Sequence, residues 1–378
     1  MINCPIVIFQ WGYKEIMNIL TLNAISEKAN HILDGYTIAK ECENPVGILV
    51  RSFNMNEWDL PTSVLAVARA GAGVNNIPHS DYAQKGVCVF NTPGANANAV
   101  KELAIASLIL ASRNLYPAMS WAKTLTGDDV AKQVEKGKGQ FVGNEILGKT
   151  LCVIGLGAIG KKVATSAHAL GMNIVAYTVP TGEDFSETVP FVKLYDTIEE
   201  AVENADFITL HIPYIPATKN TINSSLISRM KKGVIIVNTA RGEIADLEAV
   251  KEGLKEGKIR SYVLDFPTEE TLGVDGIINT PHLGASSEES EENCAVMASQ
   301  SLKEYIEKGN VINSVNLPNI SVEPTKAHRY TIISKDTVDF GGECAVRNGI
   351  RYTIIDTDDN TDETAFEKDG VIKVRKVF

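Results

Sequence analysis

The sequence predicts an α/β protein with two doubly wound parallel sheets, followed by a small α+β module at the C-terminus. Apolar, strand-like runs alternate with helical patterns along most of the chain, which is typical of parallel sheets with helices on both faces. The alternation comes in two series, and a glycine-rich turn opens the second. A chain of 378 residues also exceeds what one hydrophobic core usually holds, so more than one domain is expected.

The first series opens with a strand over residues 17–23. Residues 1–16 are either an extra segment or the result of a start codon assigned too far upstream, so we expect the natural start at Met1 or Met17. Further strands are expected over residues 47–50, 65–69 and 87–90. A long helix is expected over residues 98–113, which are rich in helix formers.

The second series predicts strands over residues 151–154, 173–177, 207–211, 234–238, 261–265 and 277–278, with helices beginning near residues 198, 224 and 246. A helix over residues 288–309 starts with acidic residues and ends on glycine, as the helix dipole favours. Residues 313–318 mark a boundary. Beyond it, three strands are expected over residues 330–333, 350–355 and 371–377.

Composition excludes several classes of function. The net charge of −11 argues against a nucleic-acid or anionic-membrane surface, and no apolar run approaches the roughly 20 residues that span a bilayer. The N-terminal residues lack a basic segment and a cleavage site, so no secretory signal is expected. The six cysteines are scattered, which predicts buried, reduced thiols in a cytoplasmic protein and no metal site.

The most informative motif is an apolar strand that runs directly into Gly-x-Gly-x-x-Gly. Gly155 allows the tight turn, Gly157 lets the backbone approach phosphates, and Gly160 lets the helix pack on the strand. The backbone N–H groups of Ala158 and Ile159 then belong to a helix N-terminus, which favours a pyrophosphate. The second sheet is therefore expected to be Rossmann-like and to bind a dinucleotide.

The acidic residue that usually grips the ribose about 20 residues further on is absent. Thr178 stands at that position, and it can bond one hydroxyl but cannot repel a 2′-phosphate. The acids Glu183, Asp184 and Glu187 follow, whereas no Arg or Lys occurs before Lys193. NAD is therefore favoured over NADP.

Four further segments match one family: residues 91–96 (NTPGAN), 238–246 (NTARGEIAD), 265–270 (DFPTEE) and 280–284 (TPHLG). With the glycine motif between the first two, the chain resembles the D-2-hydroxyacid dehydrogenases over about residues 17–317, and within that family it is most similar to the phosphoglycerate dehydrogenases. The resemblance implies a substrate-binding domain over residues 1–97 and 286–317 and an NAD-binding domain over residues 98–285. It also implies a homodimer or larger homo-oligomer, which in this architecture usually pairs through the cofactor domain.

The resemblance implies oxidation of 3-phospho-D-glycerate to 3-phosphohydroxypyruvate with NAD, the entry step to serine. An alternative substrate is glyoxylate, hydroxypyruvate or D-lactate. Another alternative is a protein that binds NAD(H) as a signal without catalysis, as some relatives of these enzymes do.

By resemblance, Arg241 holds the substrate carboxylate in a bidentate fork, and His282 takes the hydroxyl proton as hydride leaves C2. A carboxylate is expected to orient the His282 imidazole. Spacing from Asp265 and Arg241 selects Glu270, whereas matching Phe-Pro-Thr-Glu alone selects Glu269; we expect Glu270.

The remaining expected site residues fall into two groups. Arg51 is expected to pair with a substrate phosphate, the alternative being a solvated strand-end arginine, and Asp265 either contacts the nicotinamide ribose or caps its strand. The full set expected on the substrate side is Arg51, Ala72, Gly73, Val74, Asn75, Asn96 and Lys101. The full set expected on the cofactor side is Gly155, Gly157, Ala158, Ile159, Gly160, Thr178, His211, Pro213, Thr218, Thr239, Ala240, Asp265 and Gly284.

The tail over residues 318–378 resembles a truncated ACT domain, a βαββαβ unit that binds serine in many phosphoglycerate dehydrogenases. Its first and closing strands match, but residues 335–348 are too short and irregular for the usual helix and second strand. We therefore expect a module used for association, with serine feedback left open.

Overall fold

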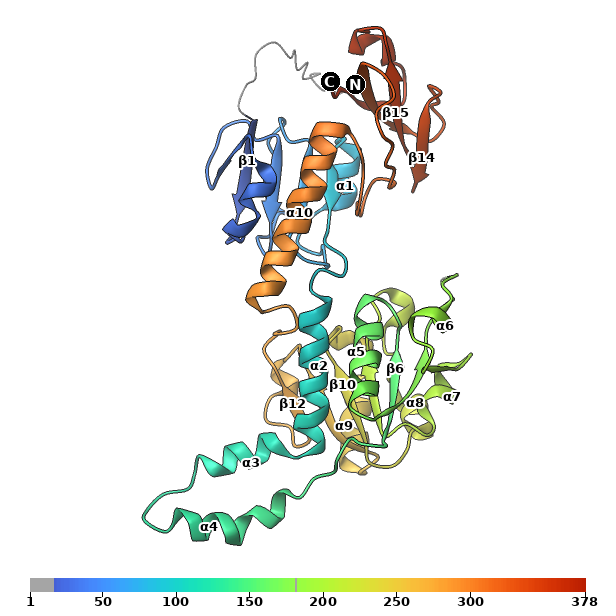
Figure 1. The fold of residues 1–378 in the computed structure, drawn as a ribbon. Helices are drawn as coiled ribbons and strands as arrows, with labels where there is room; N and C mark the ends of the chain where they lie inside the picture. The colour runs from blue at the N-terminus through green and yellow to red at the C-terminus, as the bar shows by residue number, and fades with distance from the viewer. Residues whose placement is uncertain (1–16, 181) are drawn as a thin grey trace. The chain divides into compact units, whose positions relative to one another are not determined.

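A computed structural model describes residues 17–180 and 182–378 (Figure 1). These residues form two compact units. Unit 1 combines the described residues up to Asn96 with Glu288–Phe378, and unit 2 is Ala97–Ser287. The question of how residues 1–16 begin the chain lies outside the described residues.

Unit 1 contains a five-stranded parallel sheet in the order β2-β1-β3-β4-β5. Its central strand is buried along its whole length, as expected for a parallel sheet covered on both faces. The strands are β1 (Met17–Leu22), β2 (Tyr36–Ala39), β3 (Gly47–Val50), β4 (Ala66–Arg69) and β5 (Cys88–Phe90). The short helices of this unit are η1 (Glu27–Leu33) and α1 (His79–Gln84).

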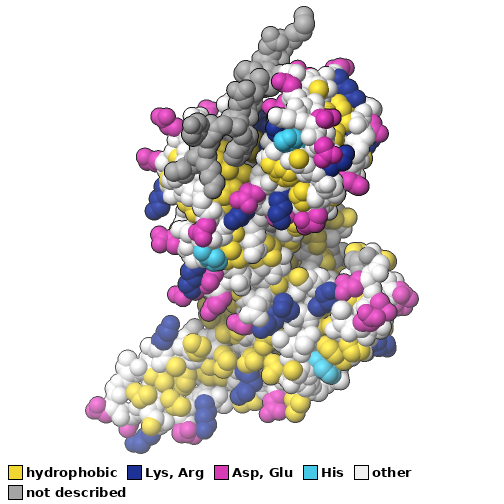
Figure 2. Space-filling model, turned by 45° about the horizontal axis from the view of Figure 1, so that its top comes forward, with side chains coloured by type: hydrophobic (Ala, Val, Ile, Leu, Met, Phe, Trp, Pro, Cys, Tyr) yellow, Lys and Arg dark blue, Asp and Glu magenta, His cyan; other side chains and the backbone are white. Residues whose placement is uncertain are grey.

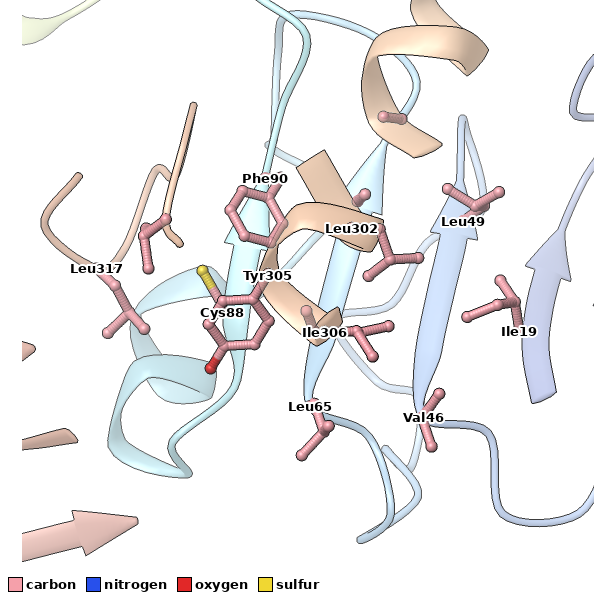
Figure 3. Packing of buried hydrophobic residues seen from close by; sticks show 14 of the residues in the cluster. Ile19, Val46, Leu49, Leu65, Cys88, Phe90, Leu302, Tyr305, Ile306 and Leu317 are labelled. Carbon is pink, nitrogen blue, oxygen red and sulfur yellow. The ribbon is translucent and has the colours of Figure 1, made fainter. Parts of the chain in front are cut away.

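Helix α10 (Glu288–Lys308) comes late in the sequence but packs on this first sheet. Leu302, Tyr305 and Ile306 face the strands, and their side chains meet those of Ile19 and Phe90 in one buried cluster (Figure 3). The approach is close, because a Cβ on Gly47 of β3 would lie 2.9 Å from Leu302 Cδ2. Burial of apolar surface therefore returns the chain to unit 1 after unit 2 is complete.

Unit 2 contains a seven-stranded parallel sheet in the order β12-β11-β10-β9-β6-β7-β8. The chain starts in the middle at β6, adds β7 and β8 on one side, and then adds β9 to β12 on the other. The strands are β6 (Thr150–Ile154), β7 (Asn173–Tyr177), β8 (Lys193–Leu194), β9 (Phe207–Leu210), β10 (Val234–Asn238), β11 (Ile259–Leu264) and β12 (Ile277–Asn279). The reversal at β6 and β9 is the topological switch point where such sheets bind ligands.

Two separate hydrophobic clusters cover the two faces of this sheet. One cluster includes the buried sides of α2 (Ala97–Ser112) and α5 (Ala158–Ala169), which also contact each other. The opposite cluster includes α7 (Ile198–Val202), α8 (Ser224–Arg229) and α9 (Leu247–Lys255). Further short helices of unit 2 are α6 (Phe185–Thr188), η3 (Pro216–Thr218), η4 (Gly242–Ile244) and η5 (Glu269–Thr271).

An arm projects from unit 2 after α2 (Figure 1). It consists of α3 (Leu115–Ala122), α4 (Val130–Gly137) and η2 (Lys138–Phe141), and none of these helices has a buried residue. Apolar side chains nevertheless lie on its surface (Figure 2); Met119 is 60% exposed and Val142 is 77% exposed. The arm was not anticipated from the sequence.

The C-terminal residues form an antiparallel sheet in the order β14-β15-β13-β16, which belongs to unit 1. Its strands are β13 (His328–Lys335), β14 (Glu343–Arg347), β15 (Ile350–Thr357) and β16 (Val371–Lys376), with one short helix η6 (Glu363–Phe366). The predicted α+β character is wrong for this module, because its described residues contain no α-helix. The predicted lack of a strand within residues 335–348 is also wrong, because β14 pairs with β15 across a turn at Asn348 and Gly349, whose φ angles are +51° and +77°.

Most other elements lie where the sequence predicted them, with ends shifted by one or two residues. The short strands β2 and β8 were not predicted, because both lie at sheet edges and lack a buried residue; β2 is mostly half-buried and β8 is exposed. The expectation of buried thiols holds for Cys88, Cys152 and Cys294, but Cys344 is exposed and Cys42 is half-buried. None of these five described cysteines forms a disulfide.

No helix within the described residues combines the length and the apolar character needed to cross a membrane.

Candidate functional site

The glycine-rich turn joins β6 to α5, and its three glycines have different structural requirements. Gly155 has φ +94°, and a Cβ there would lie 2.7 Å from the His211 carbonyl oxygen. A Cβ on Gly160 would lie 1.9 Å from the Gly155 oxygen. In contrast, a Cβ on Gly157 would meet nothing within 4 Å. The first and third glycines are therefore required by packing, whereas the second keeps space open beside the turn.

Helix α5 presents unpaired backbone donors at this turn. Its first intrahelical hydrogen bond runs from the Lys161 N–H to the Gly157 carbonyl, and no side chain caps the helix. The N–H groups of Ala158, Ile159 and Gly160 consequently have no intrahelical partner. Such donors at a helix N-terminus favour an anionic group.

The end of β7 differs from the usual ribose-binding arrangement. The Thr178 hydroxyl accepts a long hydrogen bond of 3.4 Å from the Leu156 N–H, so it belongs to the glycine turn. Glu183 forms an ion pair with Lys161 in the first turn of α5, at 2.6 Å. An acidic side chain thus lies beside the start of α5 although the strand end itself has none.

His211 follows β9 and is neutral. Burial lowers the pKa of its imidazole to about 3, and its Nε2 lies 2.9 Å from the Thr209 hydroxyl. The next expected contact, Thr218, donates to the Pro213 carbonyl at 2.6 Å and accepts from the Ile215 N–H at 2.9 Å. Thr218 and Pro213 therefore stabilise their own loop, η3.

The loop after β10 is held by a buried amide. Asn238 donates from Nδ2 to the Arg241 carbonyl and to the Tyr262 hydroxyl, both at 2.9 Å, and its Oδ1 accepts from the Ala240 N–H at 3.1 Å. Sequence reasoning missed this role of Asn238. The signal in the sequence was a side-chain amide at the last position of an otherwise apolar strand.

Thr239, in the same loop, is buried, and its hydroxyl has no hydrogen-bond partner among the described residues. A buried polar atom without a partner is costly, so this hydroxyl is expected to meet a ligand. Together with the open space at Gly157 and the unpaired N–H groups of α5, it fits a bound dinucleotide. Thr178, Thr239 and the turn of Gly155–Gly160 are the residues that would hold it.

Arg241 lies directly after this loop. Its Nη1 donates to the Ala240 carbonyl at 2.7 Å, and its Cζ lies 5.2 Å from the centre of the Phe266 ring. The guanidinium is therefore supported by an aromatic ring on a neighbouring loop. This contact was not anticipated from the sequence.

Asp265 is 1% exposed and organises the loop that carries His282. Its two carboxylate oxygens accept hydrogen bonds from the Thr280 hydroxyl at 2.6 Å and from the Leu283 and Gly284 N–H groups, each at 2.8 Å. A Cβ on Gly284 would lie 3.2 Å from that carboxylate. Asp265 thus caps a loop rather than only its own strand.

His282 adopts φ +57°, a left-handed conformation that is uncommon for a residue other than glycine. Its ring centre lies 4.5 Å from that of Phe266, with the two planes at 47°. Strained backbone held in place by surrounding hydrogen bonds is a frequent feature of functional sites. Arg241, Asp265 and His282 follow β10, β11 and β12, which are neighbours in the sheet.

The two acids expected to orient His282 follow Asp265 and Phe266 along the chain. Glu269 and Glu270 both belong to the short helix η5, and both are exposed. The choice between them stays a prediction.

In unit 1, Arg51 follows β3 and forms an ion pair with Glu291 of α10 at 2.7 Å. Arg69 ends the adjacent strand β4, and its Nε donates to the Arg51 carbonyl at 3.0 Å. Arginines therefore stand at the ends of two neighbouring parallel strands, and the sequence analysis assigned a role only to Arg51.

The other expected substrate residues lie on loops of unit 1, with one exception. The Ala72 carbonyl accepts a hydrogen bond from Asn91 at 2.7 Å, and the Asn75 carbonyl accepts one from Asn56 at 3.2 Å. Gly73, Val74 and Asn96 lie on loops as well. The exception, Lys101, lies in α2 of unit 2. There it lines a hollow of about 440 Å³ together with Asn98, Lys161, Lys162, Thr165, Ser166, Thr188 and Val189.

Within the described residues, no group of three His, Cys, Asp or Glu side chains is arranged to hold a metal ion.

Comparison with known proteins gives consistent matches. The sequence pattern of the D-isomer specific 2-hydroxyacid dehydrogenase NAD binding domain matches residues 105–284. D-3-phosphoglycerate dehydrogenase of Methanocaldococcus jannaschii is 40% identical over 263 residues, covering 68% of this chain and 48% of that protein. Hydroxypyruvate reductase of Thermotoga maritima is 40% identical over 239 residues, covering 61% of this chain and 74% of that protein.

Among solved structures, the NAD+-bound 3-phosphoglycerate dehydrogenase of Entamoeba histolytica is similar with a TM-score of 0.64 and 27% identity. That likeness covers 80% of this chain and 99% of the other. The chain spans about half the length of the first curated relatives that it matches, 48% in both cases.

Proposed function

Because this chain belongs to the D-isomer specific 2-hydroxyacid dehydrogenase family, and residues 105–284 match its NAD-binding domain, we propose that it oxidises a D-2-hydroxy acid with NAD. The observation that carries the proposal is the row of strand ends β10, β11 and β12. These neighbouring strands are followed by Arg241, Asp265 and His282, at the edge of the sheet where α/β folds bind ligands.

Each residue has a role in the proposed reaction. The Arg241 guanidinium binds the substrate carboxylate through two parallel hydrogen bonds. The His282 imidazole accepts the proton of the C2 hydroxyl, and it returns that proton in the reverse direction. Asp265 keeps the His282 loop in its left-handed conformation. Bound NAD would supply the acceptor for the hydride that leaves C2.

We propose 3-phospho-D-glycerate as the substrate and 3-phosphohydroxypyruvate as the product, which is the first step of serine biosynthesis. Curated relatives at 30–40% identity are named D-3-phosphoglycerate dehydrogenase. Arg51 and Arg69, at adjacent strand ends of unit 1, are the cations that we assign to the substrate phosphate.

A second candidate is an unphosphorylated acid such as hydroxypyruvate, glyoxylate or D-lactate. Two observations favour it: the relative named hydroxypyruvate reductase, and the ion pair that joins Arg51 to Glu291 at 2.7 Å. A carboxylate already bound to Arg51 would compete with a substrate phosphate.

We also propose that the protein is a homodimer or larger homo-oligomer. The arm of unit 2 carries exposed Tyr116 and Met119, and exposed Val142 follows it directly; exposed apolar side chains on helices that have no buried residue favour a protein partner. Light scattering of the intact protein and of a Met119→Asp variant tests this, since the variant should shift the protein toward monomer.

The substrate assay follows NADH formation at alkaline pH with 3-phospho-D-glycerate, D-lactate, D-glycerate and glycolate. A preference for the phosphorylated acid supports the first substrate, and activity only on the others supports the second. Binding of NADH without turnover of any acid would favour an NAD(H)-sensing protein.

The variant Arg51→Ala separates the two substrates further. If Arg51 binds the phosphate, the substitution should raise KM for 3-phospho-D-glycerate by at least about tenfold and barely change KM for D-glycerate, because only the phosphorylated acid loses a charge-assisted contact. Equal increases in KM for both acids would show that Arg51 does not bind the phosphate.

A further inference from the structure

Among the described residues, Phe266 has a ring that contacts both Arg241 and His282. The Arg241 Cζ lies 5.2 Å from its ring centre, and the His282 ring centre lies 4.5 Å from it. We infer that Phe266 is a positioning residue that sets the spacing between the carboxylate-binding guanidinium and the proton-accepting imidazole. The inference rests on the proposed function and adds a residue to it.

The ring is itself well anchored. Phe266 is partly buried and packs against the hydrophobic cluster formed by the β-strands and by α8 and α9. It also lies 3.8 Å, through its Cβ, from the position that a Cβ on Gly242 would occupy. Because the Phe266 ring is held by the core, it can restrict the movement of the Arg241 and His282 side chains that contact it.

Arg241 depends on such support. Its guanidinium donates one hydrogen bond, to the Ala240 carbonyl, and forms no ion pair with a carboxylate among the described residues. A guanidinium that donates two parallel hydrogen bonds to a substrate carboxylate has to be held in one orientation. Contact with an aromatic ring does this without using the donors that the substrate needs.

His282 is positioned by two consecutive residues, Asp265 and Phe266. Asp265 fixes the backbone of the His282 loop through three hydrogen bonds, whereas the ring of the next residue, Phe266, contacts the imidazole itself. Consecutive residues at the end of β11 thus fix first the loop and then the side chain. A proton acceptor placed in this way needs no further ordering when substrate binds.

The test compares Phe266→Leu and Phe266→Met with Phe266→Tyr. Leu and Met fill apolar volume but have no ring, while Tyr keeps the ring. We expect the first two to lower kcat by about tenfold and to raise KM for the hydroxy acid by about tenfold, with the Kd for NADH unchanged within about twofold. Phe266→Tyr should stay within about threefold of the parent in kcat and KM.

Unit 2 offers a matched control. Phe191 stacks on His168 with ring centres 4.1 Å apart and planes at 6°, away from the strand ends that carry Arg241 and His282. Phe191→Leu removes an equivalent aromatic–histidine contact and should leave kcat and KM within about twofold of the parent. Equal losses in Phe191→Leu and Phe266→Leu would overturn the inference, as would loss of activity in Phe266→Tyr.

A second measurement does not need activity. The Cε1–H proton signal of His282, identified by its disappearance in His282→Asn, should be shifted by the neighbouring ring and should move in Phe266→Leu but not in Phe191→Leu. If the parent protein turns over no hydroxy acid, the proposed function fails and this measurement alone decides the inference. A His282 signal that does not move in Phe266→Leu would overturn it.

Discussion

The polar groups at the strand ends of unit 2 fall into two kinds, those held by the protein and those left for a ligand. Asp265 accepts three hydrogen bonds and Asn238 takes part in three, so both serve the local fold. The buried Thr239 hydroxyl has no partner among the described residues. This contrast separates residues that build the site from residues that we expect to contact the cofactor.

His282→Asn tests the proposed proton acceptor. Asn has a similar size but cannot take a proton, so kcat should fall by about 10²–10⁴-fold while the Kd for NADH stays within about twofold. Steady-state kinetics and NADH fluorescence measure these quantities. His168→Asn, at an exposed position of α5, is the control; near-normal turnover in His282→Asn would contradict the assignment.

Asp265→Asn tests the support of the His282 loop. Asn keeps the shape but loses the charge and one of the two acceptor oxygens, so at least one loop N–H loses its bond. We expect kcat to fall by about tenfold, because the loop no longer fixes the imidazole. The exposed Asp275→Asn provides the comparison, and unchanged kcat in Asp265→Asn would mean that the loop holds its shape without this carboxylate.

At the scale of elements, the turn from β6 into α5 shows how one motif serves both packing and binding. Gly155 and Gly160 let strand and helix meet, since a Cβ at either position would lie within 2.7 Å of a backbone oxygen. Gly157 has an ordinary φ of −71° and open space around it, so no protein atom demands a glycine there. A ligand is the remaining physical reason for it.

Alanine at each of two glycines separates these roles. Gly160→Ala should reduce the free energy of unfolding by about 1–3 kcal/mol, because its Cβ collides with the Gly155 oxygen. Gly157→Ala should keep the stability of the parent yet weaken NADH binding by at least about tenfold, because its Cβ enters the space for the phosphates. Denaturant titration and NADH fluorescence distinguish them, and parent-like NADH affinity in Gly157→Ala would argue against a pyrophosphate at this turn.

At the scale of the whole molecule, unit 1 is held together by segments from both ends of the described chain. Arg329 of β13 is fully buried, donates to both carboxylate oxygens of Asp356 at 2.7 and 2.9 Å, and donates to the Lys308 carbonyl at the end of α10. Arg375 of β16 donates to the Tyr305 and Ile306 carbonyls of the same helix end. Two cations at a helix C-terminus satisfy its free carbonyls and its dipole.

This anchoring bears on the C-terminal module. Tyr352 donates to the Gly309 carbonyl at 2.7 Å, and Ile333, Ile350 and Ile354 join the cluster that includes Tyr305 of α10. The resemblance to an ACT domain stays a prediction. Within unit 1, these buried groups attach the C-terminal module to α10.

The buried ion pair predicts a pH dependence of stability. Hydrogen bonds from Arg329, the largest cause, hold the pKa of Asp356 below its ordinary value. The pair therefore stabilises the folded state above the unfolded pKa of about 4, and this stability is lost as the pH falls through the lower folded pKa. Arg329→Met should destabilise unit 1 by about 3–5 kcal/mol near neutral pH and flatten the loss at acid pH.

Denaturant titration between pH 3 and 7 measures this effect, with hydrogen exchange of the β13 amides reporting on the module itself. Lys326→Met is the control, because its ion pair with Asp358 is exposed and spans 4.0 Å. A parent-like slope with pH in Arg329→Met would show that Asp356 does not contribute in the predicted way.

The sequence by itself determined the two parallel sheets, the glycine turn and the order of the family motifs. These are local properties: strands such as Val234–Asn238 are buried along their whole length and apolar up to their last residue, and Gly155 and Gly160 stand where the turn requires them. The hydrophobic pattern and backbone sterics act over a few residues, so they can be read along the chain.

Only the tertiary structure decided which side chains meet. It joined Phe266 to Arg241 and His282, joined Arg51 to Glu291, and showed that Asp265 caps the His282 loop. It also revealed the arm and the strand β14. These contacts depend on sheet order, register and burial across residues far apart in sequence, and such long-range distances are not fixed by any local pattern.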